Sequence, residues 1–165
     1  LTSPIVCEAM SERTALRIGP ACVALTGNVD PSRWTLDAGH RTFFSPTTPP
    51  HLRLQVEWGP TKCQVGRLVF QAGPVASFYR DGSQWSIRLG EGNGSFPADR
   101  VLWLDASGAT GRIVMTPNRY PHPERRYPLE YPLEELLFRH LLADHNAVLV
   151  HSCGVSWRGR GYLFL

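Results

Sequence analysis

A histidine at the end of an apolar run is the strongest candidate for a reacting side chain. Residues 148–150, Val-Leu-Val, lead directly into His151, and the small residues 152–154 follow it. An imidazole titrates near neutral pH, so it can donate a hydrogen bond or relay a proton. The alternative is a buried histidine that is hydrogen-bonded within a hairpin, since a strand end suits both. Both interpretations stay open for His151, which is the one catalytic candidate.

Two patterns could suggest metal binding, and both are weak. His140 and His145 are five residues apart, whereas two ligands on one helix face are four apart. The four cysteines are scattered and form no C-x-x-C pair: Cys7, Cys22, Cys63 and Cys153. They are typical of buried free thiols in a reducing compartment, so we predict no metal site.

Two further stretches imitate ligand-binding motifs. Gly90, Gly92 and Gly94 form a glycine-rich segment, but no helix or lysine follows it, which favours a loop over a phosphate cradle. Arg119 to Tyr131 interleaves arginine and tyrosine as an RNA-binding strip would, yet its prolines favour a solvated, extended connector at 118–131.

The elements that must position these residues are mainly short strands. His51 to Trp58 alternates apolar and polar side chains, which places its apolar groups on one face of a strand, and Gly59-Pro60 ends it. We expect further strands at Ile5 to Ala9, Ala15 to Ile18 and Cys22 to Thr26. Pro31 to Pro50 is expected to be a loop around Arg41 to Phe44.

Two hairpins are expected in the middle of the chain. Val75 to Arg80 and Gln84 to Leu89 flank Asp81-Gly82, a dipeptide that tolerates the positive φ of a tight turn. Val101 to Asp105 and Arg112 to Thr116 are separated by a longer, glycine-containing loop.

One helix is expected, from about Pro132 to Asp144. Proline suits the first helical position, Glu134 and Glu135 suit the positive first turn, and Asn146 suits a left-handed cap. The leucines at 136, 137 and 141 recur at helical spacing, so we expect them to be buried.

A final pair of strands should follow this helix. Ala147 to Val150 has the composition of a buried strand, and Val148 to Ser156 is expected to pair antiparallel with Tyr162 to Leu165 across the turn Arg158 to Gly161.

Composition and charge limit the class of protein. The net charge of +3 is too small to indicate nucleic-acid binding, and no window approaches the ~20 apolar residues of a membrane helix. We expect a cytoplasmic α+β protein, mostly antiparallel β with one main helix. The expected parts are a β-rich region at 1–117, the connector at 118–131, and a helix plus hairpin at 132–165. The chain starts at Leu1 and stops at Leu165 within an apolar run, so we also expect a fragment.

The order of elements from Tyr131 to Leu165 resembles the HPr kinase/phosphorylase family. In that family a helix, an apolar strand ending in His-Gly or His-Ala, a short hairpin and an apolar strand precede the loop G-x-x-x-x-G-K-[ST]. Here the corresponding pieces are residues 133–137, residues 148–155 and residues 158–165. The loop itself does not occur in this sequence, and the only lysine, Lys62, cannot supply its lysine.

The resemblance implies an ATP-dependent kinase of bacterial type whose α/β core begins at the C-terminal end of this chain. The whole protein would bind ATP and Mg²⁺ at a loop after Leu165, and would phosphorylate a hydroxyl of a protein, peptide or small molecule. The resemblance places His151 beside the phosphates, whereas residues 1–165 alone would bind neither ATP nor Mg²⁺. Homo-oligomerisation stays open. The alternative is a β-rich binding or assembly module without catalysis.

Overall fold

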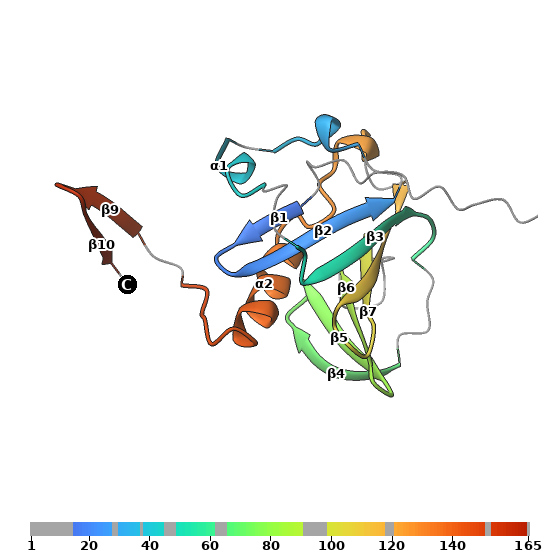
Figure 1. Cartoon of the computed structure of the whole chain (residues 1–165). Coiled ribbons are helices and arrows are strands. Elements are labelled where there is room, and N and C mark those ends of the chain that lie inside the picture. The colour runs from blue at the N-terminus through green and yellow to red at the C-terminus, as the bar shows by residue number, and fades with distance from the viewer. Residues whose placement is uncertain are drawn as a thin grey trace, which may run out of the picture.

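The structure, a computed structural model, describes residues 15–27, 30–36, 38–44, 49–61, 66–90, 99–117, 121–150 and 153–164. Eight strands form one mixed sheet in the order β1-β2-β3-β8-β7-β6-β5-β4 (Figure 1). The strands are β1 Ala15–Ile18, β2 Ala21–Gly27, β3 Leu52–Trp58, β4 Arg67–Ala72, β5 Ala76–Asp81, β6 Gln84–Leu89, β7 Arg100–Leu104 and β8 Thr110–Met115. The predicted strand at Ile5 to Ala9 lies outside the described residues.

Three neighbouring strands, β2, β3 and β8, differ from the expected antiparallel arrangement. β2 pairs with β3 and β3 pairs with β8 in parallel, while the other five pairings of this sheet are antiparallel. The sheet is therefore mostly antiparallel, as predicted, and contains a parallel group, β2-β3-β8, that was not predicted. Parallel neighbours lie far apart in the sequence, so no local turn signal indicates their pairing.

Both predicted hairpins are present. Asp81 pairs with Gln84 at the end of β5 and β6, and Gly82 has a φ of +57°, as the Asp-Gly turn requires. β7 and β8 pair from Arg100 opposite Met115 to Leu104 opposite Gly111.

The long segment between β2 and β3 is not simply a loop. It contains a 3₁₀ turn, η1, at Pro31–Arg33 and a short helix, α1, at Ala38–Arg41. The indole of Trp34 is buried against the sheet core, which holds this segment in place.

The main helix, α2, spans Leu133–Ala143, close to the predicted range, and Asn146 has the left-handed φ of +53° expected of a cap. α2 lies over one face of the sheet in Figure 1. Leu137 and Leu141 are buried as predicted, whereas Leu136 is half-buried at the edge of the contact. Helix and sheet share one hydrophobic cluster, whose largest fully buried members are Phe138, Leu16, Leu25, Leu52, Leu54, Leu89, Leu102, Ile113, Met115, Leu129, Leu133 and Leu137.

The described part of the expected connector, residues 121–131, is not solvated throughout. It includes the 3₁₀ turn η3 at Pro123–Arg125, and Tyr127 and Leu129 are buried in the shared cluster. The expectation of a solvated, extended connector is wrong for this part, because its aromatic and leucine side chains bury apolar surface that its prolines do not reveal.

The last two strands form a separate hairpin, β9 Cys153–Trp157 and β10 Arg160–Phe164, which pair antiparallel as predicted. Positive φ angles at Arg158 and Gly159 make the two-residue turn. Residues 147–150 form no strand, and Val148 is 81% exposed, so the prediction of a buried strand there is wrong. Within the described residues, no strand pairs with that stretch to bury it.

In the described part of the chain, no helix is long and apolar enough to cross a membrane.

Candidate functional site

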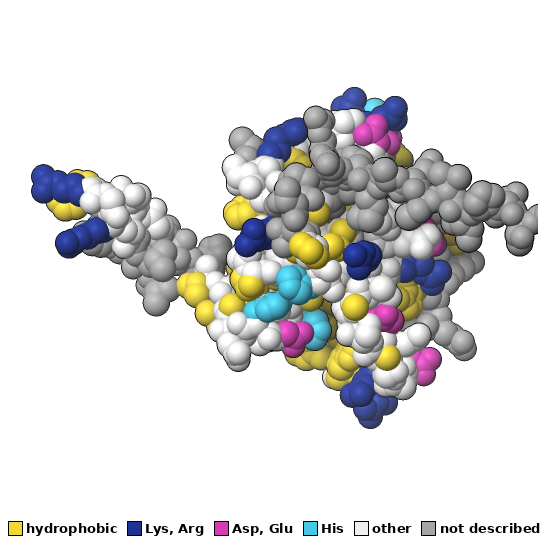
Figure 2. Space-filling view, in the orientation of Figure 1, with side chains coloured by type: hydrophobic (Ala, Val, Ile, Leu, Met, Phe, Trp, Pro, Cys, Tyr) yellow, Lys and Arg dark blue, Asp and Glu magenta, His cyan; other side chains and the backbone are white. Residues whose placement is uncertain are grey.

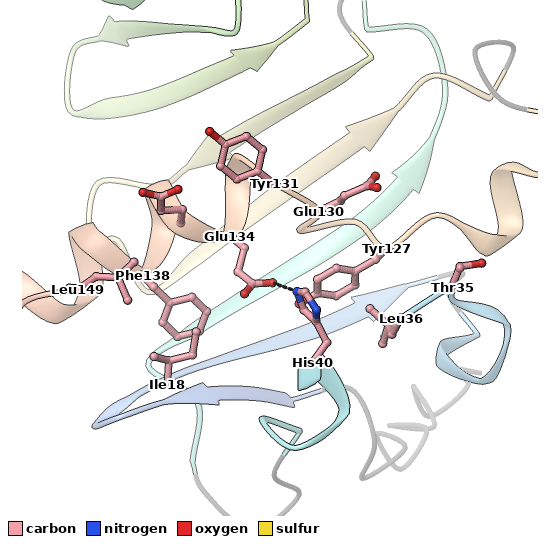
Figure 3. A pocket seen from close by; sticks show the side chains of 11 residues that line it. Ile18, Thr35, Leu36, His40, Tyr127, Glu130, Tyr131, Glu134, Phe138 and Leu149 are labelled. Atoms are coloured by element: carbon pink, nitrogen blue, oxygen red, sulfur yellow. Dashed lines mark ion pairs between the residues drawn. The ribbon is translucent and has the colours of Figure 1, made fainter. Parts of the chain in front are cut away.

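A cavity of about 400 Å³ opens between α2, the turn before it, α1 and the end of β1 (Figure 3). Its walls combine carboxylates, aromatic rings and aliphatic groups. They are formed by Ile18, Thr35, Leu36, His40, Tyr127, Glu130, Tyr131, Glu134, Glu135, Phe138 and Leu149.

An ion pair between α1 and α2 lies in this cavity. The Nε2 atom of His40 lies 3.5 Å from the Oε2 atom of Glu134, and Figure 3 shows the two side chains pointing toward one another. Glu134 occupies the first turn of α2, where a carboxylate is favoured by the helix dipole. The same carboxylate therefore stabilises the helix and holds His40 in the cavity wall.

Tyr127 lies beside this pair and is almost completely buried. Burial, and then the neighbouring Glu134 carboxylate, hold the pKa of its hydroxyl well above the usual value for tyrosine. The Tyr127 side chain therefore stays neutral throughout the physiological range and keeps its O–H as a donor.

A group of rings fixes the orientation of Tyr127. The Trp34 ring centroid lies 5.3 Å from that of Tyr127, the Phe44 centroid 6.2 Å and the His40 centroid 6.1 Å. Tilted and edge-on contacts of this kind are preferred between aromatic rings. The segment between β2 and β3 thus holds the Tyr127 ring in the cavity wall.

A buried arginine fixes the turn that precedes α2. Arg100, at the start of β7, is only 3% exposed. Its Nη1 atom donates to the carbonyl oxygens of Pro128 and Glu130, both over 3.1 Å. These bonds hold the backbone that carries Tyr127, Glu130 and Tyr131 against the sheet.

The remaining carboxylates at the cavity are paired with arginines on their own segments. Glu130 forms an ion pair with Arg126, and Glu135 forms one with Arg139. Among the described residues that line the cavity there is no arginine or lysine, the cations that bind a triphosphate. The Tyr127 hydroxyl and the Glu134 Oε2 atom are themselves buried, so the accessible wall is formed mainly by aliphatic and aromatic side chains.

His151, the predicted catalytic residue, lies outside the described residues. The other two histidines considered in the sequence, His140 and His145, have different surroundings. His140 lines a separate hollow between α2 and the sheet, and the His145 ring lies 4.7 Å from that of His51. Among the described residues, no group of three or more histidine, cysteine or acidic side chains is arranged to hold a metal ion.

Sequence reasoning missed the cavity residues His40, Tyr127 and Glu134. The sequence indicated Glu134 only as a helix-start residue and Tyr127 only as part of a connector. A tyrosine within a proline-rich stretch that lies just before an amphipathic helix is the one local signal that could have drawn attention to the site.

Comparisons with known proteins assign no family to this chain: no family model, no curated protein and no solved structure matches it.

Proposed function

We propose that this chain is the N-terminal portion of an ATP-dependent kinase related to the HPr kinases. The whole protein transfers the γ-phosphoryl group of ATP to a hydroxyl of a protein, peptide or small molecule. The supporting observation is the order of elements after the sheet. α2 is followed by the β9–β10 hairpin, in which Phe164 pairs with Cys153 and Arg160 pairs with Trp157. This helix and hairpin are two of the elements that the resemblance places ahead of a phosphate loop, whereas residues 147–150, expected as the apolar strand between them, form no strand.

The surface of the hairpin agrees with this proposal. Val155 and Trp157 of β9 are more than half exposed, at 54% and 57%, and Val148 before them is 81% exposed. In Figure 1 the hairpin stands apart from the main sheet and from α2. Apolar strands of this kind gain stability by packing against further structure, and the α/β core of a kinase would supply that cover.

The ATP site is assigned to the loop expected after Leu165 rather than to the cavity beside α2. Triphosphate binding uses backbone N–H groups at a helix start, a lysine and a metal-binding hydroxyl. The cavity offers glutamates and aromatic rings in their place. In the proposed kinase, ATP and Mg²⁺ bind at the loop, and the β-rich region recognises the acceptor or regulates the reaction.

His151 has a defined role in this proposal. It follows the run 148–150 and precedes β9, where the resemblance puts a histidine beside the phosphates. There its imidazole donates a hydrogen bond to a phosphate oxygen or relays the proton of the acceptor hydroxyl.

The second candidate function is a β-rich binding module without catalysis. It is favoured by one observation, the cavity of about 400 Å³ between α1 and α2, whose described lining residues all lie before the hairpin. In that case α2 serves only to close the cavity and cover the sheet.

The reading frame beyond residue 165 distinguishes the two candidates. The kinase proposal expects a G-x-x-x-x-G-K-[ST] loop immediately after β10, followed by a helix. A stop codon or an unrelated sequence at that place would reject the kinase and leave the binding module.

A further inference from the structure

The two edges of the main sheet differ in whether another segment pairs along them. At the β1 edge, the backbone N–H of Arg17 donates to the carbonyl oxygen of Phe43 over 2.8 Å, and Leu16 forms an antiparallel bridge with Phe44. β4 forms the opposite edge and pairs with β5. Among the described residues, no second strand lies along its outer side. An edge strand without an outer neighbour offers backbone donors and acceptors to another extended chain.

β4 is also unusually apolar for an exposed edge. Leu68, Val69 and Phe70 are adjacent, and their exposed fractions are 50%, 45% and 58%. Natural edge strands more often carry charges or proline, which discourage pairing with other chains. A shift of register between Leu68 and Phe70 is the one irregularity in this strand.

The apolar surface of β4 continues onto the face of the sheet that α2 covers. Phe70 lies opposite Phe78 of β5, with ring centroids 5.6 Å apart, and Phe78 in turn lies opposite the buried Ile87. Phe78 also lines a hollow of about 220 Å³ between β5–β7 and α2, together with Trp85 and Leu136. The edge and the hollow therefore form one continuous apolar surface.

Two arginines on neighbouring strands lie at one end of this surface. Arg67 of β4 and Arg80 of β5 are direct cross-strand partners, and both are exposed. Arg80 donates from Nε to the carbonyl oxygen of Gly82 over 2.9 Å, and its guanidinium lies 5.3 Å from the centre of the Trp85 ring. Within the described residues, no carboxylate forms an ion pair with either arginine. Like charges on directly paired residues are unfavourable, so an acidic group beside Arg67 would offset the repulsion.

Figure 2 shows the surroundings of this end of the sheet. Arginine side chains gather at the tip of the β5–β6 hairpin, next to hydrophobic side chains over the neighbouring strands. This end of the apolar strip carries Arg67 and Arg80 together with the exposed carboxylate of Asp81.

We propose that the β4 edge binds an extended peptide segment of a partner protein, which adds to the sheet as a ninth strand. The segment carries an acidic residue that lies beside Arg67 on the outer side of β4, and apolar residues that cover Leu68 and Phe70. Main-chain hydrogen bonds supply affinity, and the charge fixes the register. This binding site is independent of the kinase proposal.

The charges also argue against a second copy of this chain as the occupant. β4 has the sequence Arg-Leu-Val-Phe-Gln-Ala and contains no carboxylate. Pairing two β4 edges would bring further guanidinium groups to the interface and leave the repulsion between Arg67 and Arg80 in place.

The test uses the 165-residue chain and fluorescein-labelled peptide probes, with binding measured by fluorescence anisotropy. The main probe is a nonapeptide of alternating valine and threonine with glutamate at both ends. One control probe carries lysine in place of glutamate, and another is N-methylated on every amide so that neither of its edges can pair with a strand. We expect saturable binding of the glutamate probe, binding at least about fivefold weaker for the lysine probe, and none for the N-methylated probe.

A pair of charge-reversal variants assigns the binding to this edge. Arg67→Glu should reverse the preference, so that the lysine probe binds more tightly than the glutamate probe. Arg41→Glu makes the same change in net charge on α1, beside the opposite edge, and should leave the preference unchanged. Phe70→Ser should weaken every probe, and circular dichroism should show that all three variants remain folded.

Three results would overturn the proposal. They are the absence of saturable binding by the glutamate probe, equal binding of the N-methylated probe, and an equal response to Arg41→Glu and Arg67→Glu. A concentration-dependent dimer in sedimentation velocity that Phe70→Ser abolishes would assign the edge to a second copy of the chain instead.

Discussion

The guanidinium of Arg100 donates to the carbonyl oxygen of Glu130 over 3.1 Å and so joins the start of β7 to the turn before α2. Through this bond, and a second one to Pro128, a strand in the sheet positions the backbone that carries one wall of the cavity. The cavity therefore depends on a residue that does not line it.

Arg100→Met should lower the free energy of unfolding by about 2 to 5 kcal/mol, because one buried and one partly buried carbonyl oxygen lose a charged donor. Arg112→Met is the matched control, since Arg112 is half-exposed. Its Nη1 atom lies 3.9 Å from the Oε2 atom of Glu57 in a surface ion pair. This change should cost less than about 1 kcal/mol. Chemical denaturation measures both. Equal costs would mean that the bonds of Arg100 do not stabilise the turn.

Leu137→Ala should cost about 2 to 5 kcal/mol of stability, the usual range for a fully buried leucine. Leu136→Ala offers an internal comparison, because Leu136 is half-buried beside the hollow of α2. It should cost clearly less, as measured by the same denaturation experiment. A loss below about 1 kcal/mol at Leu137 would contradict the packing of α2 on the sheet.

Tyr127 should make the protein less stable in alkali. Its pKa is raised in the folded state, so above the ordinary tyrosine pKa of about 10 the unfolded chain releases this proton while the folded chain keeps it. The free energy of unfolding should therefore be unaffected by Tyr127 below that pH and fall as the pH rises beyond it.

Tyr127→Phe should remove this alkaline decline, as followed by denaturation between neutral and alkaline pH. Tyr131→Phe is the control, because Tyr131 is 73% exposed and its change should leave the decline in place. If both variants kept the wild-type dependence of stability on pH, the buried Tyr127 hydroxyl would not be the source of the alkaline decline.

Asp105 should resist protonation in acid. The hydroxyls of Thr110 and Ser107 donate to its carboxylate, at 2.5 and 2.8 Å, and lower its pKa from 3.8 to about 2. Its contribution to stability is present above the unfolded pKa and is lost as the pH falls from about 4 toward about 2. The carboxyl carbon shift in an NMR titration measures this pKa. Thr110→Val should raise it, and an unchanged midpoint would contradict the hydrogen bonds.

Local sequence patterns predicted the elements whose signals are contained in a few residues. The alternation from Leu52 to Trp58 became β3, the Asp81-Gly82 pair became the β5–β6 turn, and the caps of α2 were placed to within a residue or two. Each of these depends on backbone preferences and on side chains within one or two turns.

The parts that sequence reasoning missed depend on contacts between distant residues. The parallel pairing of β2, β3 and β8 brings three separated segments together, and no turn signal encodes it. The His40 to Glu134 pair joins α1 to α2 in the same way. Tyr127 is buried because Trp34 and Phe44 meet it from another part of the chain, which its proline-rich neighbourhood does not indicate.

In the proposed kinase, His151→Ala should reduce phosphoryl transfer by about 10²- to 10⁴-fold, the range for general acid–base assistance, with little change in nucleotide affinity. A single-turnover assay measures the first quantity and a nucleotide titration the second. Equal losses in both would make His151 a binding residue rather than a proton relay.

Calorimetric titration with Mg-ATP tests the central claim most directly, applied both to residues 1–165 and to a chain extended through the expected loop and its following helix. The account predicts no tight binding by residues 1–165, which hold none of the loop's amides, lysine or hydroxyl, and stoichiometric binding by the extended chain. Tight, stoichiometric ATP binding by residues 1–165 alone, or none by the extended chain, would contradict it.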